Sequence, residues 1–169
     1  MKIPFFAAAI SLIALLSGCT DDSPLNDAEV KELVADLSGS SQVSAASIDD
    51  KELTVEDEGK KSVYSLPEDE FFISIAPYET VTHPCEIHSL TGCQGELAEK
   101  EMKVTIADAK GEVHVDKAMT TPANGFIDFW LPRDETYTIQ VESEGKTGET
   151  VFSTFDGDPT CLTELPMAL

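Results

Sequence analysis

One short stretch of the chain gathers residues that bind metals or carry out thiol chemistry. His83, Cys85, His88 and Cys93 lie within eleven positions, and Cys161 follows sixty-eight residues after Cys93. Thiolates and imidazoles bind zinc and copper, whereas neighbouring thiols can instead pair as a disulfide. The residue types therefore leave three options open: a disulfide, a metal site or a thiol that takes part in chemistry.

The first eighteen residues indicate export. Lys2 supplies a short positive segment, and the apolar run FFAAAISLIALL follows it. An apolar run this short, followed by small residues, is typical of a signal peptide and not of a membrane span. The sequence Leu16-Ser17-Gly18-Cys19 also resembles a bacterial lipobox, which implies cleavage before Cys19 and lipidation of its sulfur. An ordinary secretory signal that happens to contain a cysteine is the alternative.

We therefore expect a signal peptide at 1–18, a tether at 19–24 and a lipoprotein held at Cys19 to a membrane of the periplasm or cell envelope. The whole chain has a formal net charge of −21. Such acidity argues against binding nucleic acid or an anionic lipid surface through a basic patch. Nucleic acid is thus excluded as a partner.

Lipidation changes the cysteine count. The chain has four cysteines, so three remain after Cys19 is used, and three thiols cannot all pair within one exported chain. A Cys85–Cys93 disulfide would leave Cys161 idle and the histidines unexplained. Zinc held by the three cysteines and one of His83 or His88 has suitable ligand types, but the C-x7-C spacing differs from the usual zinc knuckle.

Copper(I) suits these residues best. Soft thiolates select the cuprous ion, and two or three of them satisfy its low coordination number. Two thiols can also reduce cupric ion by forming a disulfide while the third holds the product. Cys85, Cys93 and Cys161 are the expected metal ligands, with His83 and His88 as supporting groups or as groups that capture Cu(II). No catalytic motif is present, so beyond stoichiometric Cu(II) reduction an enzyme is not predicted.

The elements that would position these residues differ between the two halves of the chain. Residues 25–39 predict a helix because Val30, Leu33, Val34 and Leu37 share one face and Asn26 can cap the start. Two short strands around a Glu-Asp-Glu-Gly turn and the strand EFFISIAPY complete a small α+β domain at 25–80. Its few apolar residues predict packing on the second half or on another copy, as a homodimer.

From residue 102 to 169 the pattern is β throughout. Short strands alternate with Gly, Pro and Asn turns, and Tyr137, Ile139 and Val141 alternate with polar residues. The series resembles a transthyretin-like or Ig-like antiparallel sandwich, which implies a scaffold. The Cys/His stretch is expected to form a loop at 81–101 between the halves, and Cys161 is expected just after the last strand. His114 alternates within a strand and is predicted to be a sheet residue.

The motifs HPCEIHSLTGCQGEL and TFDGDPTC, with cysteines spaced by eight and then sixty-eight residues, are similar to those of the CueP family of periplasmic copper-binding proteins. The resemblance covers essentially the whole mature chain. It implies binding of copper by Cys85, Cys93 and Cys161, a role in copper tolerance, and copper supply to exported cuproenzymes such as superoxide dismutase. The lipobox is a departure, because soluble members of the family lack a lipidated cysteine.

Two other functions compete with copper binding. A thiol–disulfide oxidoreductase would use the same cysteines, although C-x7-C lacks the two-residue spacing of most such enzymes. A disulfide-stapled surface module, structural or zinc-binding, would use them for stability alone. Catalytic turnover with a reductant would indicate the oxidoreductase, one tightly held copper per chain the copper protein, and neither the structural module.

Overall fold

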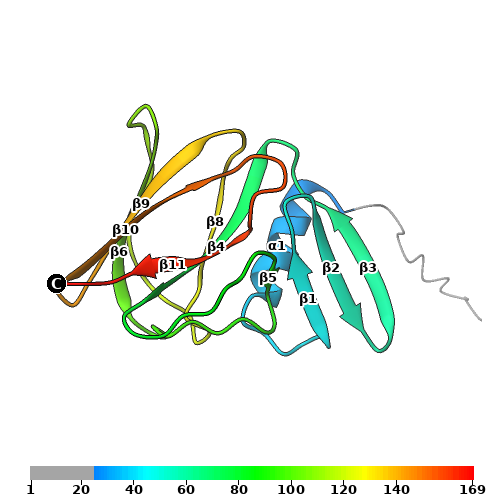
Figure 1. Cartoon of the computed structure of the whole chain (residues 1–169). Coiled ribbons are helices and arrows are strands. Elements are labelled where there is room, and N and C mark those ends of the chain that lie inside the picture. The colour runs from blue at the N-terminus through cyan, green and yellow to red at the C-terminus, as the bar shows by residue number, and fades with distance from the viewer. Residues whose placement is uncertain (1–24) are drawn as a thin grey trace, which may run out of the picture.

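The alternation of apolar and polar residues in the second half of the chain produces two facing sheets. In this computed structural model, which describes residues 25–169, one sheet has the order β10-β9-β6-β7 and the other β11-β4-β8. Figure 1 shows the two sheets face to face. The strands are β4 (Glu70–Tyr78), β6 (Glu101–Asp108), β7 (Val113–Thr120), β8 (Ile127–Pro132), β9 (Thr136–Ser143), β10 (Lys146–Ser153) and β11 (Cys161–Pro166).

Apolar side chains fill the space between these sheets. The sandwich core combines residues from both, among them Ile73, Ile75, Val104, Ile139 and Leu165. Apart from the parallel β11–β4 pair, the neighbouring strands in these two sheets are antiparallel. Over residues 25–169 the fold is thus mostly antiparallel β with one short helix and matches a β-sandwich, which the sequence predicts for residues 102–169.

The helix α1 (Asp27–Leu37) begins and ends close to the predicted positions. The Asn26 side chain accepts a hydrogen bond from the Glu29 N–H, and the Glu29 carboxylate accepts one from the Asn26 N–H. This reciprocal pair satisfies two N–H groups that the first turn leaves free. Val30, Val34 and Leu37 are buried, so the predicted apolar face is the packed face.

A second four-stranded sheet, of order β3-β2-β1-β5, packs beside the helix. It contains β1 (Ala45–Ile48), β2 (Glu52–Asp57), β3 (Lys60–Ser65) and the two-residue β5 (His88–Ser89). The hairpin β2–β3 turns through Glu58 and Gly59, which have φ angles of 48° and 77°. Two consecutive positive φ angles are the geometry of a tight hairpin turn, and glycine adopts it without strain. The predicted hairpin is confirmed.

The N-terminal segment does not form a core of its own. The buried face of α1 and the β1–β2 strands share one apolar cluster with Phe72 of β4, and Trp130 of β8 packs against it. The sequence predicts that residues 70–78 close a separate α+β unit, whereas β4 is the central strand of the β11-β4-β8 sheet. β4 is buried on both faces because the sandwich core covers one side and the N-terminal segment the other. The few apolar residues of the N-terminal segment thus gain a complete core by packing against β4 and β8 of the same chain.

The predicted signal peptide, tether and lipidated Cys19 lie outside the described residues. Within residues 25–169, no helix is both long and apolar enough to cross a membrane.

Candidate metal centre

Four side chains from distant parts of the chain meet where the sandwich, the N-terminal segment and the intervening loop join. One ligand atom each of Cys85, His88, Cys93 and Cys161 lies within 4.8 Å of the others. Three of these residues come from the 81–101 loop region and the fourth, Cys161, begins β11. The sequence prediction that Cys161 lies after the last strand is therefore wrong, because a further strand starts at this residue and pairs with β4. Three sulfurs and one imidazole nitrogen are ligands that suit Cu(I) and Zn(II), so the donor set fits a metal of this class.

Backbone hydrogen bonding places three of the four residues. Cys161 lies beside Ser74 in the parallel β11–β4 pair, and His88 lies beside Ile48 where β5 joins β1. Cys93 is brought round by a tight turn in which its N–H donates to the Ser89 carbonyl at 3.0 Å. At Gly92, within this turn, a Cβ atom would come within 2.8 Å of the Ser89 hydroxyl, so a larger residue there would make the Ser89 side chain move.

The disulfide in the structure differs from the Cys85–Cys93 disulfide that the sequence analysis considers. Cys85 forms a disulfide with Cys161, with a Cα–Cα separation of 5.5 Å, and among the described cysteines Cys93 is free. The Cys93 sulfur lies 3.7 Å from the Cys85 sulfur. A Cys85–Cys93 disulfide is therefore not the observed pairing, because strand β11 brings Cys161 directly to Cys85. Metal binding by three thiolates requires prior reduction of the Cys85–Cys161 bond.

His88 is fully buried, with 0% of its surface exposed. Neither ring nitrogen has a hydrogen-bond partner within residues 25–169, and the ring lies 4.7 Å from that of Phe126. Burial lowers the pKa of His88 to about 4; Asp128 opposes this shift and His83 adds to it. At neutral pH the ring is therefore uncharged and keeps a free lone pair. Buried polar groups without partners are rare in folded proteins, so this imidazole is a ligand candidate.

The two histidines of the motif have different surroundings. His83 is half-buried and lies 6.3 Å from the Phe126 ring, and it does not belong to the four-residue group. The sequence treats His83 and His88 alike, because both flank Cys85 at short distance. Only the pairing of β5 with β1 turns His88 inward beside the sulfurs.

A carboxylate beneath the site escapes the sequence analysis. Asp128 of β8 accepts hydrogen bonds from the hydroxyls of Ser74 and Ser38, each at 2.5 Å. Ser74 is paired with Asp128 on one side and with Cys161 on the other, so the three residues form a row across β8, β4 and β11. The signal in the sequence is a serine within EFFISIAPY and an aspartate within FIDFW, polar residues in otherwise apolar strands.

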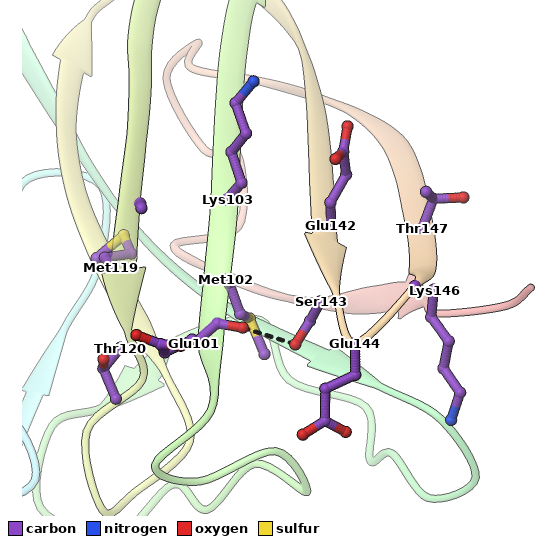
Figure 2. Close-up of a pocket in the computed structure, with 12 residues that line it drawn as sticks. Glu101, Met102, Lys103, Met119, Thr120, Glu142, Ser143, Glu144, Lys146 and Thr147 are labelled. Atoms are coloured by element: carbon purple, nitrogen blue, oxygen red, sulfur yellow. Dashed lines mark hydrogen bonds between the residues drawn. The ribbon is translucent and has the colours of Figure 1, made fainter.

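A surface hollow of about 570 Å³ lies elsewhere. It is on the β10-β9-β6-β7 sheet and contains no cysteine or histidine among its lining residues. Figure 2 shows Glu142 and Glu144 of this hollow pointing in opposite directions, and the Ser143 hydroxyl donating to the Glu101 carbonyl. Its soft donors are the thioethers of Met102 and Met119, which are cross-strand partners, and it lacks the three thiols and the imidazole of the four-residue cluster.

A second group, Asp108, Glu112 and His114, is explained by local structure. Asp108 accepts hydrogen bonds from the N–H groups of Lys110 and Glu112, which fixes the β6–β7 turn. His114 Nε2 lies 3.6 Å from the other carboxylate oxygen of Asp108, and its ring meets Tyr137 edge-on at 5.3 Å. His114 therefore fits the interpretation as a sheet residue.

A β-sandwich with three cysteines and a buried histidine at one junction is the arrangement of a small protein whose donor set suits a soft metal ion. The family model for CueP, described as periplasmic copper-binding protein CueP, matches residues 29–166. The chain belongs to this family and is a periplasmic copper-binding protein of the CueP type.

A solved structure supports the same assignment. The crystal structure of S.CueP is 42% identical in sequence, covers 82% of this chain and 89% of its own, and superposes with a TM-score of 0.76. A search of the curated proteins gives no match.

Proposed function

We propose that this protein binds Cu(I) through Cys85, Cys93 and Cys161 once the Cys85–Cys161 disulfide is reduced, with His88 as an additional ligand. The observation that carries the proposal is the convergence of the four ligand atoms within 4.8 Å from two separate segments, the 81–101 loop region and the start of β11. Thiolates favour Cu(I) over harder ions, and its low coordination number needs no further group. The uncharged imidazole of His88 does not repel the incoming cation.

The disulfide-bonded arrangement also supports stoichiometric reduction of Cu(II). Two thiolates give up two electrons as the Cys85–Cys161 bond forms, and two Cu(II) ions each take one to become Cu(I). Cys93 remains as a thiol 3.7 Å from the Cys85 sulfur and retains one of the product ions. Another reductant must reopen the disulfide before the next cycle, so the step is not catalytic by itself. His83, nearer the surface, first captures Cu(II).

In this proposal the copper is held for tolerance in the periplasm and delivered to an exported cuproenzyme such as superoxide dismutase. Lipidation of Cys19 would keep the protein at the membrane. A homodimer through residues 25–80 would use the outer surface of that segment, because its core is completed within one chain. Family membership supports the periplasmic location and copper binding. The anchor, the client and the dimer are inferences from the sequence.

A thiol–disulfide oxidoreductase is the second candidate function. The observation in its favour is a free thiol, Cys93, within 3.7 Å of a disulfide sulfur, since thiolate attack on a disulfide is how such enzymes act. Repeated turnover of a disulfide substrate with a small-thiol reductant would identify this activity. One equivalent of tightly held copper without turnover would identify the copper protein.

The copper proposal is tested by competition between reduced protein and a cuprous chelator. Cys161→Ser should weaken Cu(I) binding by more than about a hundred-fold, because losing a ligand should exceed the ten- to hundred-fold effect of losing a group that supports one. Unchanged affinity in this variant would mean that Cys85 and Cys93 bind copper alone, and the three-thiolate site would be wrong. Tighter binding of Zn(II) than of Cu(I), measured in the same way, would favour the zinc alternative.

A further inference from the structure

Thr160, the residue before Cys161, uses every polar group that it has in hydrogen bonds to other segments. Its side chain is buried, with 1% of the residue exposed. The hydroxyl donates to the Ile48 carbonyl at 2.6 Å and accepts the His88 N–H at 3.1 Å. Its own N–H donates to the Glu86 carbonyl at 2.9 Å, and its carbonyl accepts the Ser74 N–H at 2.9 Å. One residue thus connects four segments.

Each of these partners lies next to a group of the metal centre. Glu86 follows Cys85, and His88 belongs to the cluster itself. Ile48 is the partner of His88 in the β1–β5 pair, and Ser74 is the partner of Cys161 in the β4–β11 pair. The backbone positions of Cys85, His88 and Cys161 therefore all depend on Thr160.

We propose that Thr160 is the positioning residue of the metal centre, and that its hydroxyl keeps His88 and Cys161 assembled after the Cys85–Cys161 disulfide opens. The inference rests on the proposed copper-binding function and extends it to the reduced state. In the oxidised protein the disulfide already joins Cys85 to Cys161 across 76 residues of chain. In the reduced protein that covalent connection is gone, and the Thr160 hydrogen bonds remain.

The physical argument is preorganisation. Ligands that must be ordered when the metal arrives reduce the affinity, because part of the binding free energy is spent on ordering them. Thr160 orders the segments during folding instead, through bonds that do not involve sulfur. Removing its hydroxyl leaves the His88 N–H and the Ile48 carbonyl without this partner in a buried place, which costs more than the bond itself contributes.

The chain contains a matched control. Thr121 is also 1% exposed, and its hydroxyl donates to the Leu97 carbonyl at 2.6 Å and accepts the Lys100 N–H at 2.9 Å. It has the same burial and the same donor and acceptor pattern, but its two partners lie outside the cluster of Cys85, His88, Cys93 and Cys161. Thr121→Val therefore measures what a buried threonine hydroxyl contributes to stability alone.

The experiment compares reduced wild type, Thr160→Val, Thr160→Ser and Thr121→Val in competition for Cu(I) with a cuprous chelator. Thr160→Val should bind Cu(I) about ten-fold more weakly, corresponding to loss of roughly one hydrogen-bond free energy. Thr160→Ser keeps the hydroxyl and should remain near wild type, as should Thr121→Val despite a similar loss of unfolding free energy. Wild-type affinity in Thr160→Val, or an equal loss in Thr121→Val, would overturn the proposal.

Two measurements without metal, a glutathione equilibrium and amide hydrogen exchange, test the role of Thr160 independently of copper binding. In equilibrium with reduced and oxidised glutathione, the effective concentration of the Cys85 and Cys161 thiols should fall about ten-fold in Thr160→Val and stay unchanged in Thr121→Val. A wild-type chain that fails to bind Cu(I) would refute the copper function, and the glutathione equilibrium would still decide the role of Thr160. No change in that equilibrium would refute the positioning role.

Amide hydrogen exchange of the wild type covers the case in which Thr160→Val does not fold. The His88 and Thr160 N–H groups should keep their protection when the disulfide is reduced. A loss of protection beyond about a hundred-fold at both sites on reduction would show that the disulfide, and not Thr160, holds the segments together.

Discussion

The two faces of strand β4 are both buried, yet they carry different chemistry. Phe71, Ile73 and Ile75 face the sandwich core, where they pack in one hydrophobic cluster with residues of the opposing sheet. On the opposite face, Ser74 lies between Asp128 and Cys161 beneath the metal centre. The same nine-residue strand thus builds the core on one side and the floor of the site on the other.

The comparison shows how differently the two faces are stabilised. Apolar burial is non-directional and scales with the area removed from water, so the core face needs only good packing. Polar groups in a buried place need partners of defined geometry. Asp128 has them in the hydroxyls of Ser74 and Ser38, whereas His88 has none within the described residues. The face with the incomplete hydrogen bonding is the one next to the proposed copper site.

Ile73→Ala tests the core face and should give the largest loss of stability. Ile73 is 1% exposed, and removing its methyl groups should lower the free energy of unfolding by about 2–5 kcal/mol, through lost burial and a cavity. Chemical denaturation of the oxidised protein measures this loss. The Cu(I) affinity of the folded, reduced variant should stay within about two-fold of wild type, and a parallel fall in affinity would mean that the two faces are not independent.

Asp128→Asn tests the other face and should have an intermediate effect. Asparagine has nearly the same volume, but it lacks the negative charge that strengthens the hydrogen bonds from both serine hydroxyls. The free energy of unfolding should therefore fall by about 1.5–3 kcal/mol. Binding of Cu(I) should also weaken several-fold, because a negative charge near the site attracts the cation. Denaturation and chelator competition give the two quantities.

Asp116→Asn is the control for charge. Asp116 is exposed on β7, where its carboxylate lies 3.8 Å from the Lys103 ammonium group. This variant loses the same charge and should change neither quantity appreciably, because an exposed ion pair contributes little. Equal effects of the two variants on copper binding would indicate that total charge, and not the position of Asp128, matters.

Glu96→Gln tests the 81–101 loop, which carries three residues of the metal centre, and should have the smallest and most local effect. The Glu96 carboxylate accepts hydrogen bonds from the Thr80 hydroxyl and from the N–H groups of Glu79, Thr80 and Val81. This holds the segment just before His83. These hydrogen bonds lower the pKa of Glu96 from 4.5 to about 2, and the bond from the Thr80 hydroxyl has the largest effect. The uncharged glutamine side chain should accept these hydrogen bonds more weakly than the carboxylate does. Hydrogen exchange of the Glu79, Thr80 and Val81 N–H groups should therefore become faster, on the order of ten-fold.

The pH dependence follows from that lowered pKa. The unfolded carboxyl takes up a proton near pH 4.5 and the folded one only near pH 2, so its stabilising effect is complete above 4.5 and is lost as the pH falls toward 2. Protection factors of the Thr80 and Val81 amides, corrected for intrinsic exchange, should fall across this range in wild type and stay flat in Glu96→Gln. A flat wild-type profile would contradict the carboxylate clamp.

The sequence alone determined the features that depend on near neighbours. The capping box at Asn26 and Glu29, the turn at Glu58 and Gly59, and the alternation of residues 136–143 can all be predicted, because each is fixed by groups within a few residues. The three cysteines could be predicted as metal ligands for a similar reason, because their residue type and their odd number are read directly from the sequence. Family membership, carried by the same motif, is confirmed by the matching model.

Only the tertiary structure decided how those residues are combined. It paired Cys85 with Cys161 and not with Cys93, selected His88 over His83, and moved residues 70–78 into the sandwich. It also placed Thr160 and Asp128 at the site. No local signal encodes these choices, because each depends on strands that pair across tens of residues of sequence. Their register fixes which side chains meet, and hydrophobic burial on both faces of β4 fixes the register.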